Sequence, residues 1–227
     1  MKKEIIILGS TGSIGKSILK IIRRNKKNFI IKLLTTNANV SSILSQAIEF
    51  NVKNVVINNS KKYLLYKNKF TKNKINVYFS VDEVIKKFKK KVFYTINGIS
   101  GIQGLEPTIK IIPLTKNIAI ANKESIICGW NLIKKIASKN NTKIIPIDSE
   151  HFSIMKLLEN QKIKDVKKIY LTASGGPFLN YKIKKLKKVK PRQAIKHPKW
   201  KMGKKISIDS ATLMNKVFEI IEAQRIF

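Results

Sequence analysis

The stretch E-I-I-I-L-G-S-T-G-S-I-G, residues 4–15, decides the fold class. Residues 4–8 form a short apolar run without helical period, which predicts a buried strand. Isoleucines then recur at helical spacing, at positions 14, 18, 21 and 22. A strand, a glycine-rich turn and a helix in this order are the context that a dinucleotide-binding fingerprint requires. The sequence therefore predicts a nucleotide site near the start of the chain.

The glycines of this turn have separate roles in such a site. Gly9 permits the tight turn, Gly12 lets the backbone approach a pyrophosphate, and Gly15 allows the helix to pack closely on the strand. Backbone N–H groups at a helix start favour an anion, and the candidate donors are Thr11, Gly12, Ser13 and Ile14. The spacing G-x-x-G-x-x-G is a variant of the fingerprint, and a purely structural turn is the alternative.

Strand-sized apolar runs alternate with helical patterns as far as residue 147. This alternation predicts a Rossmann-like α/β domain over residues 1–150, with a doubly wound parallel sheet. Ligands bind beyond the carboxyl ends of the strands in such sheets. Four segments fall there, namely 9–15, 98–104, 122–124 and 148–150.

The pattern changes after Glu150, where residues 151–227 are expected to begin an α+β catalytic domain. In this part we expect strands at 168–172 and 206–208, and a last helix that runs from about Ser210 to the end of the chain.

The end of the second expected strand, residues 29–34, bears on the choice of cofactor. NAD-specific enzymes usually place an acid there to hold the ribose 2′-hydroxyl. The sequence instead continues Thr35-Thr36-Asn37-Ala38-Asn39, without an acid and also without a lysine or arginine. The missing acid favours NADP over NAD.

The stretch K-I-I-P-I-D-S-E-H, residues 143–151, carries a second signal. It reads as a buried strand that ends in two carboxylates, Asp148 and Glu150. Residues two apart in a strand point to the same side, so both side chains face one point in space. Such oxygen ligands suit Mg²⁺ or Mn²⁺. The alternative is a polar strand end with solvated acids, although the chain has only 13 Asp and Glu against 47 Lys and Arg.

The formal net charge of +34 taken alone suggests nucleic acid or an anionic surface as a partner. Lysine, isoleucine and asparagine are, however, spread along the whole chain, and no aromatic-rich RNA-binding motif or zinc-finger spacing accompanies the charge. A lysine-coated enzyme surface without a nucleic-acid partner is the preferred interpretation. Part of the excess charge would attract a phosphorylated substrate.

The cellular location is expected to be the cytoplasm. Cys128 is the only cysteine, which rules out an intrachain disulfide and fits a reducing compartment. The apolar runs are strand-sized, so no membrane span is expected.

Several longer motifs make a family resemblance specific. They are G-S-T-G-S-I-G at 9–15, A-N-K-E-S at 121–125, P-I-D-S-E-H at 146–151, S-G-G-P at 174–177, H-P-K-W-K-M-G at 197–203 and I-D-S-A-T-L-M-N-K at 208–216. In this order they resemble the 1-deoxy-D-xylulose 5-phosphate reductoisomerase family. That family continues with the rest of its catalytic domain and a C-terminal helical domain. Phe227 falls inside the last expected helix, so we expect the chain to be part of a longer enzyme.

The resemblance implies an NADPH- and metal-dependent oxidoreductase of the non-mevalonate isoprenoid route. Its substrate is a small sugar phosphate, 1-deoxy-D-xylulose 5-phosphate, which is rearranged to a branched aldehyde. Hydride from NADPH then reduces the aldehyde to 2-C-methyl-D-erythritol 4-phosphate. The full-length protein is expected to be a homodimer.

The metal ligands that the resemblance implies are Asp148, Glu150 and Glu219. Glu222 is the alternative third ligand, because Asn215, Glu219 and Glu222 share one face of the last helix at i, i+4 and i+7. Leu213, Val217 and Ile221 would form its apolar face. An amphipathic surface helix is the alternative reading of this segment.

The other implied site residues fall into three groups. The phosphate would be held by Ser174, Ser210, Asn215 and Lys216, and Ser149, Glu219, Lys123, His197 and Trp200 would complete the substrate site. Lys123, Glu150 and His197 are the catalytic candidates. Besides the glycine-rich turn, NADPH would contact Asn37, Asn39, Asn122, Glu124 and Gly203.

The resemblance also bears on a lid over the substrate and on the grip on the cofactor. His197, Trp200 and Met202 would lie on a flexible lid that closes over the substrate. At Ala38 many family members have a lysine beside the adenosine phosphate, which weakens the expected grip on NADPH.

Two other classes of protein are the alternatives to this family. A different NADP-dependent dehydrogenase, such as a semialdehyde dehydrogenase, would need a catalytic cysteine or a different histidine context. Cys128 is followed by Gly129-Trp130 in an expected helix and lacks that setting. A basic nucleic-acid-binding protein rests on charge alone.

Overall fold

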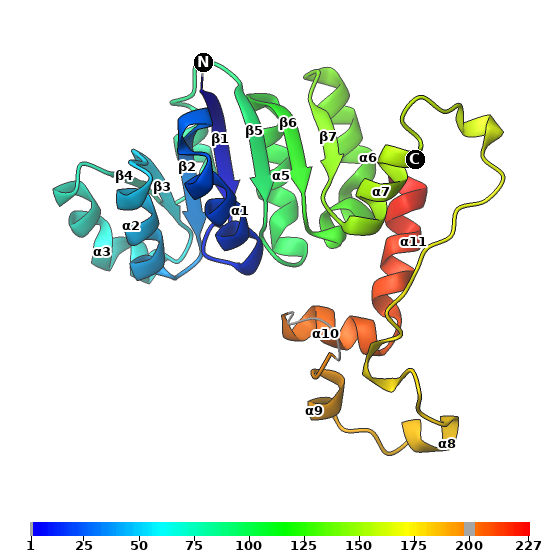
Figure 1. The fold of residues 1–227 in the computed structure, drawn as a ribbon. Helices are drawn as coiled ribbons and strands as arrows, with labels where there is room; N and C mark the ends of the chain where they lie inside the picture. The colour runs from blue at the N-terminus through cyan, green and yellow to red at the C-terminus, as the bar shows by residue number, and fades with distance from the viewer. Residues whose placement is uncertain (1, 198–202) are drawn as a thin grey trace. The chain divides into compact units, whose positions relative to one another are not determined.

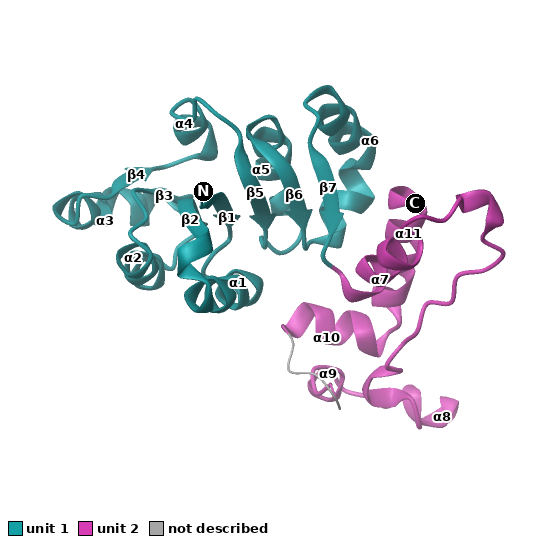
Figure 2. Ribbon diagram, turned by 45° about the horizontal axis from the view of Figure 1, so that its top comes forward, with its two compact units in different colours: residues 1–147 teal, residues 148–227 magenta. Residues whose placement is uncertain are grey.

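The computed structural model describes residues 2–197 and 203–227. The chain forms two compact units, Met1–Ile147 and Asp148–Phe227, which are coloured separately in Figure 2.

The first unit is built on one seven-stranded parallel sheet with the order β4-β3-β2-β1-β5-β6-β7 (Figure 1). Its strands are β1 Lys3–Leu8, β2 Phe29–Thr36, β3 Asn54–Ile57, β4 Asn76–Tyr78, β5 Val92–Asn97, β6 Thr115–Ile120 and β7 Lys143–Pro146. The sheet grows from β1 toward β4 on one side and from β5 toward β7 on the other. The neighbouring strands β1 and β5 therefore mark the point where the strand order reverses, and such points hold ligands in open α/β sheets.

Helices cover both faces of this sheet. They are α1 Ser13–Arg24, α2 Val40–Glu49, α3 Ser60–Lys72, α4 Val81–Ile85, α5 Leu105–Ile111 and α6 Lys123–Lys139, with the single turns η1 Lys26–Asn28, η2 Ile102–Gly104 and η3 Ile112–Leu114. In Figures 1 and 2, α1 and α2 lie on one side of the sheet, and α5 and α6 lie on the other. The predicted Rossmann-like doubly wound fold is confirmed.

Burial on both faces explains why β1 is a continuous apolar run. Ile6, Ile7 and Leu8 each have no exposed surface, so successive side chains enter the core on alternate sides of the sheet. Ile5 and Ile7 join a core cluster in which residues of α1, α2 and the neighbouring strands pack together. The hydrophobic core therefore fixes the strand end at which the glycine-rich turn begins.

The second unit consists of helices and irregular segments. Its helices are α7 Ser149–Leu157, α8 Ile183–Leu186, α9 Pro191–Ala194, α10 Lys204–Ala211 and α11 Met214–Ile226, with the single turns η4 Ile163–Asp165 and η5 Gly176–Phe178. The described residues of this unit contain no strand. The chain between η4 and η5 is irregular (Figure 1).

The two strands predicted in this unit are wrong. Residues 168–172 are irregular, with Tyr170 81% exposed, and 206–208 lie within α10. Ile206 and Ile208 suggested a strand because they alternate with a polar residue, yet in the helix Ser207 is buried and both isoleucines are exposed. A strand needs a neighbouring strand for its backbone hydrogen bonds, and among the described residues neither segment has one.

The single last helix predicted from Ser210 is also wrong, because α10 and α11 are separate. Leu213 lies between them with a φ of +62°. This left-handed conformation is not compatible with a continuous right-handed helix. The break allows α11 to take a direction of its own, which matters because α11 carries Glu219.

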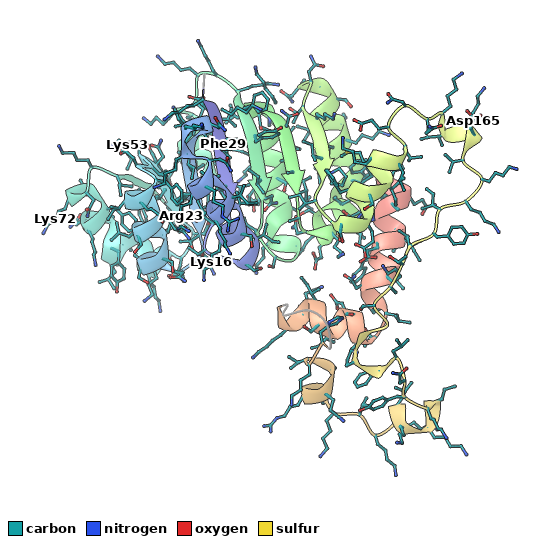
Figure 3. All side chains as sticks on the ribbon, in the orientation of Figure 1. Lys16, Arg23, Phe29, Lys53, Lys72 and Asp165 are labelled. Carbon is teal, nitrogen blue, oxygen red and sulfur yellow. The ribbon has the colours of Figure 1, made fainter. Side chains whose placement is uncertain are left out.

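The surface charge is carried by separate side chains on several elements. Lys16, Lys53 and Lys72 are exposed and extend from the first unit in Figure 3. Among the described residues, no helix is both long enough and apolar enough to cross a membrane.

Candidate functional site

The glycine-rich turn connects β1 to α1 where the strand order reverses. Gly9 has a φ of +75°, which favours glycine. A Cβ on Gly15 would lie 2.4 Å from the Cα of Ser10, so a side chain there would force the helix away from the turn. The first turn of α1 carries no acid, and Gly12 is its N-cap. Backbone N–H groups therefore dominate this helix start, as a bound phosphate requires.

The loop after β5 packs directly against this turn. The Gly98 N–H donates to the Leu8 carbonyl at 2.9 Å, and a Cβ on Gly9 would lie 3.0 Å from the Ile99 nitrogen. The Asn122 side-chain amide donates to the Gly101 carbonyl at 2.8 Å and to Ser125 Oγ at 2.7 Å. Asn122, a cofactor candidate, is thus buried and braces the loop.

The end of β2 supplies hydroxyl and amide groups. Thr35 Oγ1 accepts from the Gly9 N–H at 2.8 Å, and the hydroxyls of Thr36 and Thr11 lie 2.7 Å apart. Asn39 caps α2, because its Oδ1 accepts from the Ser42 N–H at 3.2 Å. Asn37 and Ala38 are exposed. Lys123 and Glu124, also in this unit, occupy the first turn of α6.

Three carboxylates converge in the second unit. Asp148, Glu150 and Glu219 each offer one oxygen, and these atoms all lie within 4.8 Å of one another. Asp148 and Glu150 stand at the start of α7, whereas Glu219 comes from α11. Glu219 is buried, with 1% of its surface exposed. This all-oxygen set suits a hard divalent ion.

The geometry that led to Asp148 and Glu150 was wrong, although the two residues do meet. β7 ends at Pro146, Asp148 is the N-cap of α7, and Glu150 lies in the first helical turn. The carboxylates therefore do not alternate along a strand. A helix N-terminus favours negative charge, which helps to hold two acids in one place.

Lys216 contacts two of these three carboxylates. Its ammonium group is 3.2 Å from Glu150 Oε1 and also contacts Glu219 Oε2 and the Thr172 carbonyl. Asn215, one position earlier, donates from its side-chain amide to Glu219 Oε1. Two residues assigned to the phosphate thus contact metal-ligand candidates directly.

Hydrogen bonds and charge change the pKa values of this group. Burial favours the neutral acid, but hydrogen bonds from Ser149, from the backbone and from Lys216 lower the pKa of Glu150 to about 2. Burial also favours neutral Lys216, yet Glu219 and Glu150 raise the pKa of its ammonium group above the usual value. The structure therefore holds Glu150 as an anion and Lys216 as a cation.

A second cluster gathers other substrate-site candidates. Ser174 Oγ lies 2.9 Å from His197 Nε2 and accepts from the Gly176 N–H at 3.3 Å. Gly176 is so close to α10 that a Cβ on it would lie 2.9 Å from the Ser210 carbonyl oxygen. Ser174, His197 and Ser210 therefore come from adjoining segments. Gly203 is the N-cap of α10, and the lid residues Trp200 and Met202 lie outside the described residues.

The apolar face predicted for the last helix is wrong. Glu219 and Glu222 are each 1% exposed, whereas Leu213 and Val217 are 53% and 44% exposed. The face that carries the acids is the buried one. Its partner is His151 of α7, which the sequence does not mark as a site residue, because no local spacing links it to residues of α11.

Comparison with known proteins identifies the family of this chain. The 1-deoxy-D-xylulose 5-phosphate reductoisomerase family matches residues 5–129, and the C-terminal domain of the same enzyme matches residues 144–227. The enzyme of this name from Pelagibacter ubique is 54% identical and that from Wolbachia pipientis of Culex pipiens 44% identical, each over 99% of this chain. The chain spans 58% of the length of each of these relatives.

Solved structures of proteins from the same family also match this chain. A DOX-P reductoisomerase crystallised with NADPH, fosmidomycin and magnesium has a TM-score of 0.88 and 35% identity, over 99% of this chain and 58% of that one. The enzyme from Zymomonas mobilis with NADPH has a TM-score of 0.88 and 34% identity, with the same coverage. By sequence and by structure, this chain belongs to the 1-deoxy-D-xylulose 5-phosphate reductoisomerase family.

Proposed function

We propose that the protein containing this chain converts 1-deoxy-D-xylulose 5-phosphate to 2-C-methyl-D-erythritol 4-phosphate, with NADPH and Mg²⁺ or Mn²⁺. The observation that carries the proposal is the convergence of Asp148, Glu150 and Glu219 in a chain of this family. The magnesium and NADPH in a related structure support the two cofactors.

The three carboxylates would hold the divalent ion. When bound, the ion would polarise the substrate carbonyl as a Lewis acid and orient the neighbouring oxygens. Glu150 is ready for this role because its low pKa keeps it ionised at neutral pH. The Asn215 side-chain amide donates to Glu219 Oε1, so the Glu219 carboxylate is already oriented.

The substrate phosphate would be held by hydroxyl and amide donors and one cation, from Ser174, Ser210, Asn215 and Lys216. The approach of Gly176 to α10 supports this grouping, because it brings the Ser174 segment onto Ser210. Ser149 and His197 would contribute further substrate contacts, and His197 with Trp200 would exclude water when the lid closes. Lys123 would assist the chemistry from the start of α6.

The cofactor would lie over residues 1–150, and residues 151–227 would begin the catalytic domain. The pyrophosphate would meet Gly9, Thr11, Gly12, Ser13, Ile14 and Gly15. The remaining contacts would come from Asn37, Asn39, Asn122, Glu124 and Gly203. Asn122 braces the loop after β5, so it would act on the cofactor through that loop.

The protein is expected to bind NADPH more tightly than NADH. The end of β2 offers hydroxyl and amide groups and no acid that would repel a 2′-phosphate. Fluorescence titration of the chain with both nucleotides measures the preference. Equal or tighter binding of NADH would contradict it.

The reaction itself is tested with the full-length protein. We expect NADPH oxidation that requires both 1-deoxy-D-xylulose 5-phosphate and Mg²⁺ or Mn²⁺, that stops with a chelator and that resumes when the metal is restored. Mass spectrometry should identify 2-C-methyl-D-erythritol 4-phosphate. NADPH binding without substrate-dependent oxidation in the metal-loaded protein would refute the proposed activity.

Two features of the whole protein complete the proposal. The full-length protein is expected to be a homodimer, and light scattering measures its mass. Its expected location is the cytoplasm, which fractionation of the source cells would test.

A further inference from the structure

Two buried polar side chains beside the acidic group have no role in the chemistry above. His151 has no exposed surface, and Glu222 is 1% exposed. Burying such groups costs free energy unless they are paired. Their contacts therefore indicate what they do.

His151 connects the two helices that carry the proposed metal ligands. It follows Glu150 on α7, and its Nε2 lies 2.8 Å from the backbone carbonyl oxygen of Glu219, 68 positions away on α11. A carbonyl oxygen only accepts hydrogen bonds, so Nε2 carries the hydrogen and donates it. Asp148, Glu150 and Glu219 are called the metal triad below. The imidazole of His151 thus connects the segment that carries the first two of these residues to the third.

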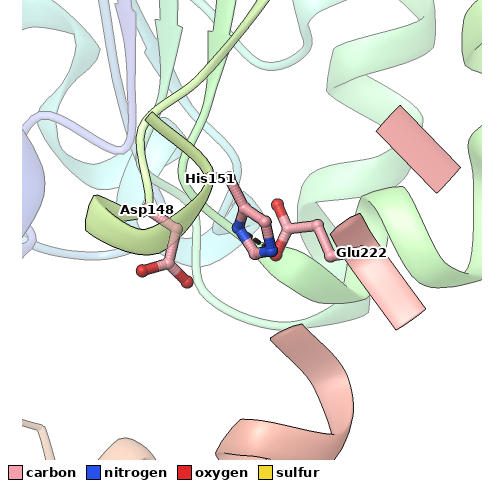
Figure 4. A group of neighbouring side chains, drawn as sticks. All are labelled: Asp148, His151 and Glu222. Atoms are coloured by element: carbon pink, nitrogen blue, oxygen red, sulfur yellow. Dashed lines mark ion pairs between the residues drawn. The ribbon is translucent and has the colours of Figure 1, made fainter. Parts of the chain in front are cut away.

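Glu222 lies beside the other edge of the same imidazole. Its Oε2 lies 3.4 Å from His151 Nδ1, and both side chains are almost fully buried. Figure 4 shows the imidazole facing the carboxylate of Glu222, with their contact drawn between them. Glu222 comes one helical turn after Glu219 on α11. Both ring nitrogens of His151 therefore face α11, Nε2 through a hydrogen bond to Glu219 and Nδ1 through a 3.4 Å contact with Glu222.

A second interpretation of these residues is a separate metal site. Asp148, His151 and Glu222 also place one ligand atom each within 4.8 Å of one another. Two observations disfavour it. Nδ1 of His151 already faces Glu222, and Asp148 also belongs to the all-oxygen set with Glu150 and Glu219.

We propose that His151 and Glu222 are positioning residues for the metal triad: they fix the distance between the start of α7 and Glu219. The inference rests on the proposed function in one respect, namely that the triad binds a divalent ion. Partners that orient metal ligands typically change metal affinity by 10–100-fold when they are removed. The effect on NADPH should be negligible, because the glycine-rich turn is untouched.

The test compares three variants by Mn²⁺ titration, followed by electron paramagnetic resonance. His151→Asn places an amide near the Nδ1 position but loses the donor to Glu219, and is expected to weaken Mn²⁺ binding by at least about tenfold. His151→Gln extends its amide to the Nε2 position and should recover most of the affinity. Glu222→Gln keeps the shape of the side chain and is expected to weaken binding by about tenfold.

NADPH titration of each variant is the control for folding. Wild-type Mn²⁺ affinity in both His151→Asn and Glu222→Gln, with NADPH binding intact, would overturn the inference. Nitrogen hyperfine coupling between His151 and bound Mn²⁺ would also overturn it, because the histidine would then be a ligand. If the wild-type protein binds NADPH but no Mn²⁺, the metal site of the proposed function fails and this inference fails with it. Greater recovery by His151→Gln than by His151→Asn would support the contact with Glu219.

Discussion

Asp148→Asn in the full-length protein should lower turnover by several orders of magnitude and leave NADPH affinity unchanged. Asparagine keeps the shape of the side chain but removes one of the three negative charges that converge there. Because the ion would polarise the reacting carbonyl, its loss or displacement removes transition-state stabilisation directly. Turnover, Mn²⁺ affinity and NADPH affinity, measured on one preparation, check the prediction.

Two glutamate variants separate the candidate third ligands. Glu219→Gln should lower turnover and metal affinity as strongly as Asp148→Asn, because Glu219 is also a member of the metal triad. Glu222→Gln should lower metal affinity by only about tenfold. Loss of metal binding in Glu222→Gln with normal binding in Glu219→Gln would assign the third ligand to Glu222. If neither Asp148→Asn nor Glu219→Gln weakens metal binding, the shared site does not exist.

The first unit was predictable from sequence because its signals are local. The apolar run of β1, the positive φ of Gly9 and the close contact at Gly15 all follow from adjacent residues. The parallel order of the strands follows from their alternation with helices. In such a fold the sequence alone locates the end of each strand, because each apolar run ends at a turn.

The second unit was less predictable because its contacts are long-range. Ile206 and Ile208 have the spacing of a strand, but the helix that contains them turns Ser207 inward. The pairing of His151 with the carbonyl of Glu219 joins residues 68 positions apart, and no periodicity reveals it. Glu219 was identified by family resemblance, and only the structure shows that it is buried.

The acidic stretch at 148–150 shows how a correct pair of residues can follow from an incorrect geometry. Extended backbone and the first turn of a helix can both bring two acids together, so their spacing did not distinguish them. The difference matters for the chemistry. A helix start adds a favourable field for carboxylates, which a strand end does not.

Lys216→Gln is expected to have two opposite effects, because Lys216 is both a proposed phosphate ligand and the present partner of the acids. Its ammonium group contacts Glu150 and Glu219, so an incoming divalent ion must displace it. Raising the pH within the neutral range does not relieve this competition, because the raised pKa keeps the Lys216 ammonium charged there. Removing the ammonium should therefore strengthen Mn²⁺ binding several-fold when substrate is absent.

The same substitution should lower kcat/KM by about 10–100-fold. A hydrogen bond to a charged group contributes about 1.5–3 kcal/mol, and the variant loses the only cation assigned to the phosphate. Lys156→Gln is the matched control, because Lys156 is an exposed lysine on α7 that pairs with the exposed Glu159 at 2.7 Å. Mn²⁺ titration without substrate and steady-state kinetics with it measure the two effects separately. If Lys216→Gln weakens Mn²⁺ binding, the ammonium supports the carboxylates rather than competing with the ion, and the expected exchange of Lys216 between acids and phosphate is wrong.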